Sequence, residues 1–289
     1  MKKYILSLIA IAFFSCANTP QLNQTYNEPS KSSWLILNHI KFEKSQTFYD
    51  LLMDKVYPAI FSYKDPDINV NNANKEAQKF GRLFKPLNMN EDSTWTYIFM
   101  ADPFINNSTT SILKPLKQKF GNDESQKILD AWSSCFTKKG QESFFGQDIP
   151  FSGFKNKIKS KPGNTIMIVL NYIKPNMNQK FEKLTLNDVL PVVAEYRDPS
   201  DDIHALNQKA LEEMRFMRPR SQNKDKSWSY VFIGDPYIDE GNYFITKPFV
   251  QKYGEENAED KLKETGWNNS FNSGQVSYLL EELDLTIFE

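Results

Sequence analysis

The chain has 289 residues, of which 40% are hydrophobic and 14% aromatic, with 35 Lys and Arg against 36 Asp and Glu. This near-neutral balance provides no basic surface of the kind that binds a polyanion, which argues against a nucleic-acid partner. The two cysteines are Cys16, in the N-terminal segment, and Cys135. If Cys16 carries a lipid, as inferred below, Cys135 has no partner for an intrachain disulfide, and the fold must rest on its core.

The first 15 residues have the pattern of an export signal. Lys2 and Lys3 precede an apolar run that ends at Phe14, and the small Ser15 follows. The run is shorter than the about 20 apolar residues of a membrane-spanning helix. With Cys16 next, the segment resembles a bacterial lipobox, although Phe13 stands where that family usually has Leu. The resemblance implies that 1–15 is a removed signal peptide and that a lipid is attached to Cys16. The alternative is an ordinary secretory signal.

Residues 16–33 are predicted to form a lipidated N-terminus and a flexible tether, because they contain almost no apolar side chains that could bury a core. No acidic cluster directly follows Cys16. In lipoproteins resembling those of Bacteroidetes, such a cluster marks export to the cell surface. We therefore expect a protein of the cell envelope that is anchored to a membrane through its lipid and faces the periplasm.

An internal repeat organises the rest of the chain. Trp95-Thr96-Tyr97-Ile98-Phe99 matches Trp228-Ser229-Tyr230-Val231-Phe232, and Asp102-Pro103 matches Asp235-Pro236, both 133 positions apart. The same offset holds without gaps from about Trp34 to about Ala131. The repeated segment is longer than the repeats of solenoid proteins, so it indicates two copies of a whole folding unit. We predict a first unit at 34–148, a linker at 149–164 and a second unit at 165–289.

Each unit is expected to contain strand, helix, strand, strand, helix and strand. Apolar and β-branched runs predict strands, helical periodicity predicts helices, and a polar Asp-Pro segment predicts a loop. In the first unit the strands are Trp34–Ile40, Phe80–Leu87, Thr94–Asp102 and a short one around Ser143–Gly146, which corresponds to Val276–Leu279; the helices are Ser45–Phe61, with Ser45 as N-cap, one from Pro115 to a C-cap at Gly121, and one from Asp123 to Trp132; the loop is Lys64–Asn74.

This order is that of the split βαβ, or ferredoxin-like, unit. Helices cover only one face of its sheet, so the other face needs a cover, and two copies in one chain can meet sheet to sheet. The chain thereby resembles the dimeric α+β barrel superfamily in a fused tandem form. The resemblance implies an α+β fold of two βαββαβ repeats packed sheet to sheet, and a pseudo-dimer that is a monomer in solution.

The alternation of side chains along a strand divides each strand into two faces. We assign the aliphatic residues of the third strand to the helix side and its aromatic residues to the space between the sheets. Asn38 and Arg82 would join them there, and the second copy repeats the set. The predicted ligand-binding residues are Asn38, Arg82, Trp95, Tyr97, Asn171, Arg215, Trp228 and Tyr230. The alternative is structural, with Asn and Arg hydrogen-bonded between the two sheets.

We predict that the site binds a ligand. Some barrels of the superfamily resemble haem-degrading monooxygenases, with an Asn, a Trp and a helical His. Asn38 and Trp95 match two of these, but neither His39 nor His204 lies on a second helix, so we predict no cofactor. Metal-ligand spacing, a phosphate-binding loop and a nucleophile elbow are not found. We expect a small amphipathic or aromatic ligand between the sheets; the alternatives are a metal-independent oxygenase or isomerase-like enzyme, and an interaction scaffold. No catalytic residue is predicted.

Overall fold

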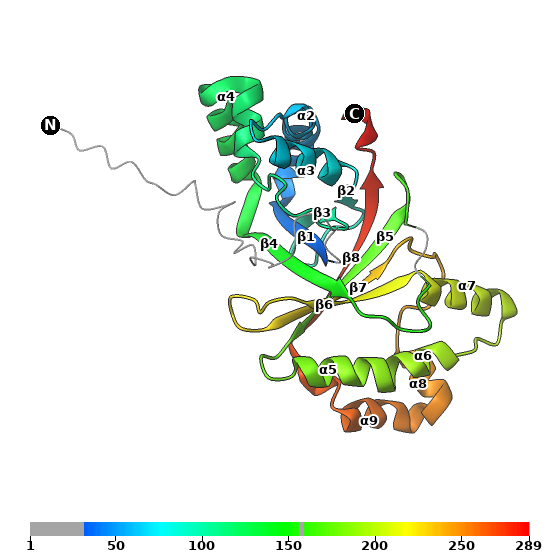
Figure 1. Cartoon of the computed structure of the whole chain (residues 1–289). Helices are drawn as coiled ribbons and strands as arrows, with labels where there is room; N and C mark the ends of the chain where they lie inside the picture. Colours follow the sequence, from blue (N-terminus) through cyan, green and yellow to red (C-terminus); the bar gives the residue numbers. More distant parts are fainter. Residues whose placement is uncertain (1–31, 156–158, 289) are drawn as a thin grey trace. The chain divides into compact units, whose positions relative to one another are not determined.

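The structure is a computed structural model that describes residues 32–155 and 159–288 (Figure 1). They divide into two compact units, unit 1 up to Ser143 together with residues from Leu283 onward, and unit 2 from Phe144 to Glu282. Helices and antiparallel strands occur in both units, which confirms a mixed α+β fold. The predicted signal peptide, Cys16 and the tether as far as residue 31 lie outside the described residues.

Unit 1 begins with a strand. The chain then passes through unit 2 and returns to unit 1, where it forms a short helical turn. Its elements are β1 (Ser32–Lys41), η1 (Phe42–Lys44), α1 (Ser45–Leu51), the π-helical turn η2 (Leu52–Val56), α2 (Tyr57–Ser62), α3 (Ile68–Gln78), β2 (Gly81–Pro86), β3 (Thr94–Ala101), α4 (Leu113–Cys135), β4 (Phe136–Asp148), which continues into unit 2, and η5 (Thr286–Phe288). Strand β3 pairs antiparallel with β1 on one side and with β2 on the other. It therefore splits the βαβ unit that β1, the helices and β2 form.

Unit 2 has the same succession of elements. They are β5 (Thr165–Ile173), α5 (Asn178–Leu184), the π-helical turn η3 (Thr185–Val189), α6 (Leu190–Glu195), α7 (Asp201–Glu212), β6 (Met214–Pro219), β7 (Trp228–Gly234), α8 (Thr246–Tyr253), α9 (Glu255–Thr265), η4 (Asn268–Ser270) and β8 (Phe271–Leu283). The strand order is β8-β5-β7-β6, all antiparallel. In Figure 1, α5, α6, α8 and α9 gather on one side of these strands. How the sheets of the two units meet stays a prediction from the sequence.

Residues 64–74 differ from the prediction, because the segment expected as a loop contains most of helix α3. Asp67 is the N-cap, and its side chain accepts a hydrogen bond from the Asn69 amide at 2.8 Å. The Asn-rich sequence has low helix propensity. Farther along the helix, the buried Asn74 accepts a hydrogen bond from the Thr109 amide at 2.6 Å. The cap and this tertiary anchor favour a helix that propensity alone does not indicate.

Three smaller differences concern element ends. Ser45 is the first residue of α1 rather than its N-cap, and its hydroxyl lies 3.0 Å from the Tyr97 hydroxyl. The two predicted helices around Gly121 form one element, α4, with a break at this residue, where φ is 78°. Strand β4 is 13 residues long, far longer than predicted. The prediction missed its first half because that half is polar and lacks the apolar alternation that marks a strand.

The core of each unit lies between its sheet and its helices. In unit 1, Ile40, Leu83 and Tyr97 of the sheet pack against helical residues such as Phe48, which is fully buried. The rings of Tyr97 and Phe48 lie 5.1 Å apart. A second cluster in unit 2 is similarly built around Phe181, Phe216, Tyr230, Phe249 and Trp267. Within residues 32–155 and 159–288, no helix combines the length and the apolar character that a membrane span requires.

This core reverses the predicted assignment of the strand faces. Opposite partners in an antiparallel pair share a face. The pairs Ile40–Trp95, Asn38–Tyr97 and Ile36–Phe99 put the aromatic residues of β3 on the helix side. The aliphatic residues Ile98 and Met100 are fully buried on the other face. The prediction was wrong because residues on both faces of β3 are buried, so the alternation of side chains does not mark which face receives the helices.

Candidate functional site

Asn38 is the predicted residue that lies nearest to the unit 1 cavity described below. Its side-chain hydrogen bonds, however, are made to other residues of the same unit. Its Nδ2 donates to the Tyr97 carbonyl at 3.3 Å and to the Ile36 carbonyl at 3.5 Å, and its Oδ1 accepts from Gln141 Nε2 at 2.5 Å. Asn171 repeats the arrangement, with its Oδ1 2.6 Å from Gln275 Nε2. Both asparagines fix strands of their own unit, which is the structural alternative considered for them.

Arg82 does not join Asn38. It pairs with Met100 in the sheet, so it lies on the face opposite to the Asn38–Tyr97 pair. Its guanidinium lies 4.9 Å from the centre of the Phe84 ring, and the residue is only 8% exposed. The predicted grouping of Asn, Arg, Trp and Tyr on one face is therefore wrong, because Arg82 is one residue out of phase with the aromatic face.

The other predicted residues also make structural contacts. Arg215 holds Asp148 through two hydrogen bonds, from Nε at 3.2 Å and from Nη2 at 2.9 Å. Trp95 stacks on the exposed Phe42, with ring centres 6.5 Å apart. Three side chains bond to the segment that precedes or begins the first helix of their unit: Tyr97 to Ser45, Trp228 to the Pro175 carbonyl, and Tyr230 to the Asn178 carbonyl and Glu182. Trp228 and Tyr230 also line a surface depression of mixed polar and apolar character beside Arg218.

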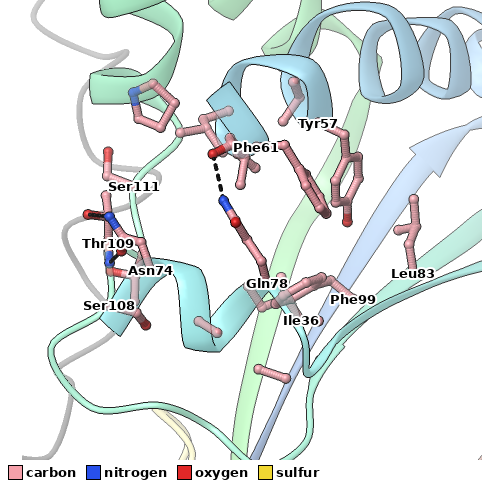
Figure 2. Close-up of a pocket in the computed structure, with 18 of the residues that line it drawn as sticks. Ile36, Tyr57, Phe61, Asn74, Gln78, Leu83, Phe99, Ser108, Thr109 and Ser111 are labelled. Atoms are coloured by element: carbon pink, nitrogen blue, oxygen red, sulfur yellow. Dashed lines mark hydrogen bonds between the residues drawn. The ribbon is translucent and has the colours of Figure 1, made fainter. Parts of the chain in front are cut away.

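A cavity of about 160 Å³ lies within unit 1, between its helices and the helix-facing side of its sheet. Residues of β1, β2, β3, α2, α3 and the loop before α4 line it. Figure 2 shows Tyr57 and Phe61 extending from α2 toward the strand residues Ile36, Leu83 and Phe99. Other apolar lining residues are Trp34, Leu52, Val56, Ile60, Phe104, Ile105, Ile112, Trp132 and Leu285. The site is therefore a pocket with aliphatic and aromatic walls under the helices.

One end of the cavity is polar, and its groups are largely paired with one another. Asn74 Nδ2 donates to the Thr109 hydroxyl at 3.2 Å, and Ser108 donates to the Ile105 carbonyl at 2.8 Å. Figure 2 shows Gln78 reaching from α3 toward α2, where its Nε2 donates to the Ile60 carbonyl at 3.1 Å. The side-chain oxygen of Gln78 has no hydrogen bond among the described residues. These amides and hydroxyls form a neutral polar end opposite the aromatic one.

Tyr57 and Trp132 are buried lining residues whose hydrogen-bond donors are not used by the described residues. Tyr57 is 5% exposed and lines the cavity, yet its hydroxyl makes no hydrogen bond with any described residue. Its ring stacks on Phe288, with centres 6.0 Å apart and planes 13° from parallel. Burial raises the pKa of the Tyr57 phenol far above its usual value, so the group stays protonated. It is a hydrogen-bond donor without a partner among residues 32–155 and 159–288.

No described residue that lines the cavity carries a formal charge. Tyr63, the second tyrosine there, donates to Asp65 at 2.7 Å, and burial followed by this bond raises its pKa to about 12. Burying an ion in such surroundings without a countercharge is strongly unfavourable. The cavity consequently suits a neutral molecule, with apolar surface on one side and hydrogen-bonding groups on the other.

The corresponding positions of unit 2 are filled. Gly81 of β2 corresponds to Met214 of β6, and Leu83 corresponds to Phe216. Phe216 lies flat on Phe232, with ring centres 4.3 Å apart and planes 15° from parallel. Smaller side chains on β2 thus leave space in unit 1 that larger ones occupy in unit 2.

Sequence reasoning missed the residues that shape this cavity, above all Tyr57, Phe61, Gln78 and Gly81. A usable signal was present in the repeat, because Gly81 and Leu83 face Met214 and Phe216 in the alignment. The signal lies in the difference in side-chain volume between the two halves rather than in the residues that they share.

The described residues do not include a cluster of three or more His, Cys, Asp or Glu that could hold a metal ion. His39 lies on the face opposite to the cavity, because it neighbours Asn38 on β1. Its Nε2 is 2.7 Å from Glu142 and its Nδ1 is 3.0 Å from the Thr96 hydroxyl. His204 belongs to α7 of unit 2. Neither imidazole is placed to serve as a ligand within the cavity.

No family model matches the sequence, and no curated protein matches it. Solved structures that resemble the chain include a provisionally assigned monooxygenase from Fusobacterium nucleatum subsp. nucleatum, with 12% identity, 88% of this chain and 92% of that chain covered, and a TM-score of 0.42. An anthrone oxidase-like protein has 6% identity, coverage of 90% and 94%, and a TM-score of 0.41. A mutant chlorite dismutase from Candidatus Nitrospira defluvii has 9% identity, coverage of 91% and 97%, and a TM-score of 0.37.

Proposed function

We propose that unit 1 binds a small, neutral and mostly apolar molecule in the cavity between its helices and its sheet. The observation that carries the proposal is the cavity of about 160 Å³, with aromatic walls and without a charged side chain among its described lining residues. An engineered apolar cavity of about 150 Å³ holds a benzene molecule. The ligand is therefore expected to contain one aromatic ring or two small fused rings.

The lining favours binding over acid–base catalysis. A general acid or base that works near neutral pH is usually an imidazole, a shifted carboxyl or a shifted amine. The described side chains around the cavity offer amides, aliphatic hydroxyls, indoles and phenols instead. The raised pKa of Tyr57, which follows from burial, keeps that phenol from acting as a base. The enzyme alternative, an oxygenase or isomerase-like activity, accordingly has less support from these residues than the binding protein.

For the location, we propose a cell-envelope protein held at a membrane by a lipid on Cys16 and facing the periplasm. The support is the N-terminal sequence, with its two lysines, short apolar run and Ser15 before the cysteine. Intact-mass analysis of the chain from a bacterial membrane fraction tests it. Loss of the first 15 residues and added acyl mass are expected, and Cys16→Ser is expected to abolish the added mass.

Calorimetric titration of the full chain tests the binding function. We expect the two-ring hydrocarbon indane to bind, and indane-1-carboxylate, of similar shape, to bind at least tenfold more weakly, because its charge would lose hydration in the cavity. Gly81→Met, which introduces the residue of the filled copy, is expected to block binding. Ser133→Met adds the same side chain at an exposed position of α4 and serves as the control. Absence of binding to the unsubstituted chain, or equal binding to Gly81→Met, would refute the proposal.

A further inference from the structure

The unpaired hydroxyl of Tyr57 gives the cavity a chemical preference beyond its size. The side chain is 5% exposed, and the described residues include no hydrogen-bond partner for its oxygen. A buried polar group that lacks a hydrogen bond costs about 1–3 kcal/mol. A hydroxyl that ends at a ligand-sized cavity can be satisfied by water or by an acceptor of the ligand.

Tyr57, at the start of α2, belongs to a cluster of three aromatic rings. The ring centre of Phe288 lies 6.0 Å from that of Tyr57 and the ring centre of Phe61 lies 6.5 Å from it, and Phe61 and Phe288 are 5.8 Å apart. Figure 2 shows the phenol directed from the helix toward the sheet, near Phe61 and Leu83 and above Phe99. The cluster packs against the ring of Tyr57, and its hydroxyl belongs to a residue that lines the cavity.

Resting on the proposed binding function, we propose that the ligand carries a neutral hydrogen-bond acceptor, a carbonyl oxygen on its ring system, which accepts a hydrogen bond from the Tyr57 hydroxyl. The apolar part of the ligand lies against Phe61 and Phe99. A carbonyl is preferred to a carboxylate because no lining cation would compensate a charge. A carbonyl is preferred to a plain hydrocarbon because only an acceptor satisfies the buried donor.

The polar end of the cavity is consistent with this assignment. Gln78 donates one N–H of its Nε2 to the Ile60 carbonyl, at 3.1 Å, so its second N–H and its oxygen remain for a ligand. Asn74 is engaged with Thr109 through both its side-chain oxygen and nitrogen. Tyr57 is therefore one of a few lining donors that a ligand carbonyl can reach, and it is a buried one whose single O–H has no bond to any described residue.

The test compares a matched pair of ligands, indane and 1-indanone, which differ by one carbonyl oxygen. Both are titrated into the full chain, into Tyr57→Phe and into Tyr63→Phe. Tyr63 also lines the cavity, but its hydroxyl is bonded to Asp65 at 2.7 Å, so it is a control for the same chemical change. Tyr57→Phe is expected to lower the ratio of the indanone to the indane association constant about tenfold, and Tyr63→Phe to leave it within about twofold.

The outcomes separate this inference from the function on which it rests. If both compounds bind and the ratio is unchanged in Tyr57→Phe, the carbonyl assignment is wrong and the binding function stands. If neither binds the unsubstituted chain, the binding function itself fails. Tighter binding of phenyltrimethylammonium than of 1-indanone would also overturn the assignment, because aromatic walls can instead form a cation site. Independently of any variant, the infrared carbonyl stretch of bound 1-indanone should lie below its value in an apolar solvent; an unshifted band would contradict the hydrogen bond.

Discussion

Gly81→Met is expected to block ligand binding and to raise the free energy of unfolding, and the size of this increase can be worked out from the structure. The position lines the cavity at the start of β2, and a Cβ placed there would come 3.4 Å from the nearest Phe99 ring carbon, an acceptable contact. Replacing a glycine whose backbone suits other residues adds about 0.4–1 kcal/mol through the unfolded state. Filling all of the about 160 Å³ cavity would add at most about 4 kcal/mol, at about 24 cal/mol per Å³.

A Met side chain fills only part of that space and loses about 1.5–2 kcal/mol of rotamer freedom on burial. The expected net gain in the free energy of unfolding is therefore about 1–2 kcal/mol. Urea denaturation of the full chain measures it, with Gly81→Ala to isolate the backbone effect and Ser133→Met to control for an added thioether. A loss of more than about 1 kcal/mol, with Gly81→Ala unaffected, would show that the space is not available to a side chain, and the reasoning about the cavity would fail.

Three further predictions concern the remaining polar residues. Asn38→Ala is expected to lower the free energy of unfolding by about 2–3 kcal/mol in urea titrations, because it leaves two strand carbonyls and an amide without their bonds. Arg215→Lys should lower it by about 1–2 kcal/mol through loss of the forked contact with Asp148, and a change near zero would contradict a structural role. Burial raises the pKa of Glu142, but hydrogen bonds from His39 and Lys139 outweigh this and hold the pKa below its usual value. The stabilising effect of the Glu142 carboxylate should be present above about pH 4.5, the ordinary carboxyl range, and be lost as the pH falls through the lowered pKa. Glu142→Gln should therefore lower the free energy of unfolding at pH 7 and change it little at pH 3, as measured by denaturation curves at both pH values. An equal cost at both pH values would refute this.

The sequence predicted the strands of unit 1 and their order well, since apolar runs such as Thr94–Ala101 are marked by composition alone. The faces of these strands were not predictable in the same way. Alternation shows that Tyr97 and Ile98 point in opposite directions, but both are buried, so neither face is marked as the helix side. Which buried face receives helices depends on the volume between layers, a tertiary quantity.

The candidate site was less predictable than the fold because it consists of space rather than of reactive groups. Asn38 attracted attention as a polar residue on a strand, yet its bonds to backbone carbonyls make it part of the sheet. Tyr57 attracted none, since a tyrosine in an amphipathic helix normally packs in a core. Its unpaired hydroxyl becomes visible only when the neighbours of the ring are known.

Residues 283–288 belong to unit 1, although the chain reaches them only after building unit 2. Leu285 lines the cavity, and Phe288 covers the ring of Tyr57. These contacts join positions more than 200 residues apart along the chain, which makes them late to form during folding. The helices and sheet of unit 1 can therefore assemble while the pocket wall is still incomplete, so a ligand present at that stage of folding meets an open apolar surface and not a finished site.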